Sequence, residues 1–168
     1  MHARGFTLQE TMIVMLLAFL AAAASIPLVR GAFNDLDDGD FAKLIETTVQ
    51  TIRTNYEQST SYTGVQASEV IPHLPQKWVL NATTIRHPLN GSMTIAADAV
   101  DPTLFNLSVT VQRDDTCRRA VLTAWPIIDS ILVDGVAVKT AAGQAMPTEA
   151  TLTARCTAAA HSIVLQSD

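Results

Sequence analysis

This 168-residue sequence contains few charged and few aromatic residues, and both shortages limit what the chain can do. Charged residues make up 16% of the sequence and aromatic residues 5%, whereas 48% of the residues are hydrophobic. The formal net charge is -5 at neutral pH. An acidic chain with so few cations lacks the basic surface that binds nucleic acid.

The sequence also lacks the motifs of a catalytic or metal centre. No HExxH, GxSxG or glycine-rich phosphate loop lies near His73, His87 or His161. The only two cysteines, Cys117 and Cys156, have no Cys or His partner at the spacing of a zinc motif. We therefore expect a protein that is not an enzyme and that holds no cofactor or metal.

What the sequence does contain is a long apolar run near its N-terminus. A short basic lead-in with Arg4 precedes the segment FTLQE, and uncharged residues then continue from Thr11 to Val29. About twenty apolar residues in helical conformation cross the hydrocarbon core of a bilayer, where the backbone must satisfy its own hydrogen bonds. The run predicts a single membrane-spanning helix over residues 6–29.

Two residues distinguish this run from a plain membrane anchor. Glu10 lies where the apolar run begins, and a carboxylate at bilayer mid-depth costs roughly 2.5–3.5 kcal/mol on insertion scales. It is either the last interfacial residue or a group that awaits a positive partner from another chain. Pro27 lies inside the run, where a proline removes a helical hydrogen bond and predicts a kink or local melting.

The residues Gly5-Phe6-Thr7-Leu8-Gln9-Glu10 resemble the prepilin peptidase site of type IV pilins and the related pseudopilins. The resemblance implies that residues 1–5 are a leader, cut between Gly5 and Phe6, and that Phe6 is then N-methylated. It also implies that Glu10 is the glutamate found fifth in mature pilins, and that Pro27 is their helix-kinking proline. A secretory signal peptide, with small residues near Ala21, is the alternative interpretation.

The next part of the chain predicts a second helical stretch. Residues 30–40 are acidic and include two glycines, which fits either a loop or a weakened part of one long helix. Residues 41–59 repeat apolar side chains with helical periodicity and predict a helix that buries one stripe against a sheet. The apolar positions are Phe41, Leu44, Ile45, Val49, Ile52 and Tyr56. We expect residues 30–59 to be the second half of a helical spine.

Residues 60–168 predict a globular α+β head. Asn90-Gly91 and Asp134-Gly135 each lie between short apolar stretches, which indicates two β-hairpins. Phe105–Gln112 alternates as a half-buried strand, and Asp114–Trp125 reads as a helix that Pro126 stops. A short helix over 147–156 and a closing strand over 161–166 complete the order, with the Arg118-Arg119 pair on a solvated helix face.

This order of elements resembles type IVb pilins, including the thin-pilus major pilins of conjugative plasmids. The resemblance implies an antiparallel sheet packed on a helical spine and a late cysteine pair, which Cys117 and Cys156 match. The short leader and the Phe start are more usual in the type IVa branch. An exported chain meets an oxidising compartment, so we expect a disulfide rather than two free buried thiols.

The resemblance implies a structural subunit that polymerises through its apolar helix into a surface filament serving adhesion, conjugation or motility. The implied partners are other pilin copies, prepilin peptidase, and an inner-membrane assembly platform with its motor. Arg4 before the span places the N-terminus in the bacterial cytoplasm and the head in the periplasm before assembly. Alternatives are a minor pilin or type II secretion pseudopilin, and a membrane-anchored adhesin that never polymerises.

Overall fold

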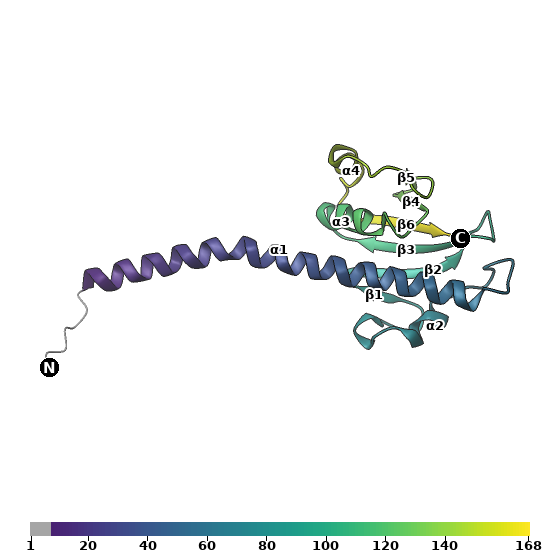
Figure 1. Cartoon of the computed structure of the whole chain (residues 1–168), viewed down its shortest axis with the longest axis horizontal. Coiled ribbons are helices and arrows are strands. Elements are labelled where there is room, and N and C mark those ends of the chain that lie inside the picture. Colours follow the sequence, from purple (N-terminus) through teal and green to yellow (C-terminus); the bar gives the residue numbers. More distant parts are fainter. Residues whose placement is uncertain (1–7) are drawn as a thin grey trace. The chain divides into compact units, whose positions relative to one another are not determined.

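The computed structural model of the chain describes residues 8–168, apart from the side chains of residues 8–10, 21–30 and 32. The chain divides into two compact units, one ending at Leu36 and the other comprising Asp37–Asp168. The first helix contributes to both units (Figure 1). The elements in chain order are α1 (Leu8–Asn55), α2 (Ala67–Val70), the 3₁₀ turns η1 (Ile71–His73) and η2 (Gln76–Trp78), β1 (Ile85–His87), β2 (Gly91–Ala97), β3 (Phe105–Val111), α3 (Asp114–Ala124), β4 (Ser130–Val133), β5 (Val136–Lys139), α4 (Glu149–Arg155) and β6 (His161–Ser167).

Helix α1 is 48 residues long and continuous. It passes through Pro27 without a break in helical backbone, and it includes residues 30–40, for which the sequence left loop and helix open. It ends at Asn55, four residues before the predicted end at Ser59. In the described part of the chain, no helix has both the length and the apolarity needed to cross a membrane. The structure therefore does not show the membrane span predicted over residues 6–29.

Six antiparallel strands form one sheet in the order β1-β2-β3-β6-β4-β5. The closing strand β6 lies at the centre, between β3 and β4, which places a late segment of the chain against an early one. Its register pairs Leu107 with Leu165, and Ile131 pairs with the same Leu165 from the other side. The predicted α+β head with an antiparallel sheet is confirmed.

Both predicted hairpins form, but their turns differ. In the β4–β5 turn, Asp134 and Gly135 both have positive φ (51° and 79°), as a two-residue type I′ turn requires. In the β1–β2 turn, Gly91 instead pairs with His87 as the first residue of β2, and Asn90 alone has positive φ (61°). The glycine is required there for space, because a Cβ at Gly91 would overlap the carbonyl oxygen of Thr110.

The core of the Asp37–Asp168 unit forms where the second half of α1 packs on the sheet. The predicted apolar stripe is buried as far as Ile52, and Tyr56 is half-buried at its end. The stripe packs with the inward side chains of the central strands, including Leu107, Val109 and Ile163. Figure 1 shows α3 beside β3 and β6, where Val121 and Ala124 join the same core.

Candidate assembly region

The described part of α1 that precedes Asp37 exposes large apolar side chains, and over residues 12–17 it does so on all sides. The side chains of residues 12–17 are consecutive, so they point in every direction around the helix, and each is at least half exposed. The exposed large apolar residues of this part of α1 are Met12, Ile13, Val14, Met15, Leu16, Leu17, Phe19, Leu20, Phe33 and Leu36. A helix that is apolar all round requires an apolar environment, either lipid or other helices.

The predicted processing and assembly residues belong to this same end of the chain. Gly5 and Phe6 lie outside the described residues. Glu10 and Pro27 lie within α1, but their side chains are outside the described part. Cleavage between Gly5 and Phe6, methylation of Phe6 and the roles of Glu10 and Pro27 in assembly therefore stay predictions.

Asp38 and Asp40, at the beginning of the second half of α1, each form an ion pair with the head. Arg119 of α3 donates from Nε to both carboxylate oxygens of Asp38, at 2.9 and 3.1 Å. Lys77, in η2, lies 2.6 Å from the carboxylate of Asp40. The predicted solvated face is wrong for Arg119, because its side chain is only 20% exposed and packs against α1. The acidic residues Asp38 and Asp40 thus help to position α1 in the head.

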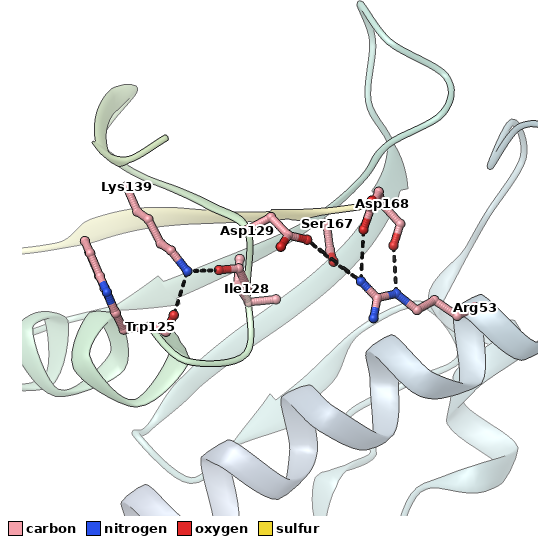
Figure 2. A network of polar contacts seen from close by, with 7 residues as sticks. All are labelled: Arg53, Trp125, Ile128, Asp129, Lys139, Ser167 and Asp168. Carbon is pink, nitrogen blue, oxygen red and sulfur yellow. Dashed lines mark hydrogen bonds and ion pairs between the residues drawn. The ribbon is translucent and has the colours of Figure 1, made fainter. Parts of the chain in front are cut away.

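The last turn of α1 binds the end of β6 (Figure 2). Arg53 donates from Nε to the main-chain oxygen of Asp168 at 2.7 Å. It also donates from Nη2 to Asp168 Oδ1 and to Ser167 Oγ, both at 3.0 Å. Ser167 Oγ in turn donates to Asp129 Oδ2 at 3.0 Å. Arg53 therefore joins α1, the central strand β6 and the segment before β4.

Lys139, at the end of β5, is buried, and its ammonium group caps the C-terminal end of α3 (Figure 2). Its Nζ donates to the carbonyl oxygens of Ile128 and Trp125, the latter at 2.7 Å. It also lies 5.4 Å from the centroid of the Trp125 ring. A cation is favourable where helix carbonyls lack partners. Sequence reasoning did not find this residue, because nothing in the local pattern separates it from a surface lysine.

The predicted disulfide between Cys117 and Cys156 is confirmed. Both cysteines are buried, and their Cα atoms are 5.8 Å apart. Cys117 belongs to α3 and Cys156 is the residue after α4, so the bond ties these two helices together and encloses the β4–β5 hairpin. The alternative of two free thiols is wrong.

Asp98 and Asp101 have lowered pKa values because each carboxylate accepts hydrogen bonds from the loop in which it lies. The pKa of Asp98 is lowered chiefly by the hydrogen bond from the Asp101 N–H, then by the Asn106 amide and the Val100 N–H. The pKa of Asp101 is lowered by hydrogen bonds from the Thr103 hydroxyl and N–H. Both residues order the β2–β3 loop. Among the described residues, no group of three or more His, Cys, Asp or Glu side chains gathers to hold a metal ion.

This architecture has a counterpart among solved protein structures, although comparison of sequences finds none. No family model matches the sequence, and no curated protein matches it either. The structure is similar to the crystal structure of TcpA, a type IV pilin from Vibrio cholerae El Tor biotype, with a TM-score of 0.56 and 12% sequence identity. The match covers 79% of this chain and 99% of TcpA.

The chain has the fold of a type IV pilin. The pilin fold accounts for the long first helix, the antiparallel sheet packed on its second half and the single disulfide. At 12% identity the likeness concerns the fold, so the role of this pilin-like chain has to be argued from its own residues.

Proposed function

We propose that this chain is the structural subunit of a type IV pilus and polymerises through the first part of α1. The observation that supports the proposal is the exposure of the consecutive apolar side chains of residues 12–17 on every side of α1, with Phe19 and Leu20 exposed after them. Burying such side chains is favourable by about 25 cal/mol per Å² of apolar area. When copies of the chain pack these helices together, the apolar side chains are shielded from water. Extraction of a helix from lipid is therefore coupled to its assembly with other copies.

In this proposal the apolar helix resides in the bacterial inner membrane before assembly. Arg4 keeps the N-terminus in the cytoplasm and the head faces the periplasm. Prepilin peptidase cuts between Gly5 and Phe6, and an assembly platform with its motor moves the mature chain into an extracellular filament. The role is structural, and the chain catalyses no reaction.

Glu10 sets the axial register of the filament in this proposal. Once lipid is replaced by neighbouring helices, a carboxylate in their apolar bundle is costly unless a positive group pairs with it. The amine that cleavage creates at Phe6 of an adjacent copy is such a group. Because Glu10 comes four residues after Phe6, about 6 Å along a helix, pairing with the amine of an adjacent copy requires neighbouring chains to be staggered along the filament axis by about that distance.

The test is Glu10→Ala in the native host, with Gln9→Ala as the matched control that changes a neighbouring uncharged side chain. We expect Glu10→Ala to reach the membrane at the wild-type level but to give no filaments in the sheared surface fraction. Gln9→Ala should give filaments as the wild type does. Normal filaments from Glu10→Ala would exclude the register role, and wild-type filaments that contain only traces of this chain would make it a minor subunit.

A further inference from the structure

His161 is a buried histidine that lies between two carboxylates from different elements. Its side chain, at the start of β6, has no exposed area. Its Nδ1 lies 2.7 Å from Oδ2 of Asp134, in the β4–β5 turn. Its Nε2 lies 3.9 Å from Oδ1 of Asp114, the first residue of α3. The three side chains therefore join β6, the β4–β5 turn and α3, which is also the helix that carries Cys117 of the disulfide.

Asp134 determines which nitrogen of the His161 ring carries the proton. The backbone N–H of Ser162 donates to Asp134 Oδ1 at 2.9 Å, and Nδ1 of His161 lies 2.7 Å from Oδ2, so each carboxylate oxygen of Asp134 faces a nitrogen atom. An ionised Asp134 only accepts hydrogen bonds, so Nδ1 of His161 is the donor. In the neutral ring, Nε2 then carries a lone pair, with which it can bind a metal ion or accept a hydrogen bond.

The Nε2 atom of His161 is buried and has no hydrogen-bond partner among the described residues. Asp114 is too far for a hydrogen bond at 3.9 Å, but its side chain is 57% exposed and free to adjust. Metal–nitrogen and metal–oxygen bonds to Zn²⁺ are about 2.0–2.2 Å each. A cation placed between Nε2 and Oδ1 would therefore reach both atoms with little movement.

We propose that His161 and Asp114 bind a divalent transition-metal cation of the Zn²⁺ class, with Asp134 as the carboxylate that orients the histidine. A histidine that donates its second N–H to a carboxylate is the usual arrangement around such metals. Imidazole favours Zn²⁺, Cu²⁺ and Ni²⁺, whereas Ca²⁺ and Mg²⁺ prefer oxygen ligands alone. Two protein ligands leave the other positions to water, so the affinity is modest.

Metal binding at this site would fasten the β4–β5 hairpin to α3. A ligand that binds only the folded state raises the free energy of unfolding by RT ln(1 + c/Kd), where c is the free ligand concentration. The effect is independent of the filament proposal, because His161, Asp114 and Asp134 all belong to the Asp37–Asp168 unit.

The test uses the full chain in mild detergent with its disulfide intact, treated with EDTA and then titrated with ZnCl₂ at pH 7.5. Calorimetry measures the affinity and thermal melting the stabilisation. We expect Asp114→Asn to weaken Zn²⁺ binding at least about tenfold, and Asp134→Asn by about 10–100-fold. Asparagine tolerates the positive φ of residue 134, so the turn is preserved.

Asp115→Asn is the matched control, because it removes an equal charge from the same helical turn, where Asp115 pairs with Arg113. It should bind Zn²⁺ as the wild type does, and CaCl₂ should stabilise none of the proteins. Equal Zn²⁺ affinity in wild type and Asp114→Asn would overturn the proposal.

A ¹⁵N spectrum of the histidine rings gives a second readout that does not depend on stability. We expect the Nε2 resonance of His161 to move on Zn²⁺ addition while Nδ1 stays protonated. A ring with both nitrogens protonated at pH 7.5 in metal-free protein, unmoved by Zn²⁺, would instead show an ion pair with the two aspartates and would refute the metal site.

Discussion

Gly91 is the residue at which the head tolerates no side chain. An added Cβ would overlap the Thr110 carbonyl oxygen and the ring of His87. The carbonyl oxygen belongs to the backbone, so no side-chain rotation can move it aside. We predict that Gly91→Ala lowers the free energy of unfolding by about 1–3 kcal/mol, as other overpacked sites do. Chemical denaturation of the full chain in detergent measures this.

The matched control for Gly91→Ala is Gly39→Ala, because a Cβ built at Gly39 meets no atom within 4 Å beyond its chain neighbours and the adjacent backbone of its own helix. The control should not lose stability. A Gly91→Ala protein as stable as the wild type would show that β2 and β3 move apart more easily than the structure implies.

His87 makes the stability of the head depend on pH. Burial against Phe41 lowers the pKa of His87, and the hydrogen bond of Nε2 to the Thr110 carbonyl offsets this only in part. The unfolded state therefore binds a proton more readily than the folded state, so stability rises with pH through this range. The stability that His87 contributes is complete above its ordinary pKa of 6.5 and is lost as the pH falls towards its lower folded value.

We predict that the wild-type protein loses more stability between pH 7.5 and pH 5.5 than His87→Gln does. Glutamine retains an N–H for the Thr110 carbonyl but does not titrate. The two proteins differ only at residue 87, so the difference between their pH dependences isolates His87. Identical pH dependence of the two unfolding curves would contradict the assignment.

At the scale of elements, α1 is a long helix that contains residues with poor helix propensity. Gly39 is exposed, has open space around it and lies within the helix rather than at its end. Glycine costs about 1 kcal/mol relative to alanine in a helix interior. We predict that Gly39→Ala raises the free energy of unfolding by about 0.5–1 kcal/mol. Hydrogen exchange of residues 37–45 that is not slowed by the change would contradict a helical residue 39.

Elements with a strong periodic or turn signal were predictable from the sequence. The stripe from Phe41 to Ile52 and the Asp134-Gly135 hairpin were confirmed because helix and turn chemistry are local. The position of β6 between β3 and β4 was not predicted, because strand order depends on contacts between residues far apart in sequence. The roles of Lys139, His161 and Arg119 were missed for the same reason.

At the scale of the whole molecule, the two compact units differ in how far their described apolar side chains are buried. The Asp37–Asp168 unit has a closed core and a disulfide of its own. In the unit that ends at Leu36, the large apolar side chains that the structure describes are exposed. The pilin fold was predictable because the GFTLQE motif and the apolar run lie together in the sequence.

Mass spectrometry of fibres sheared from the native host tests the filament proposal most directly. We predict that this chain is the main component of the fibres and that it begins at N-methylated Phe6, without residues 1–5. Fibres that lack the chain, or a native chain that still begins at Met1, would contradict the proposal.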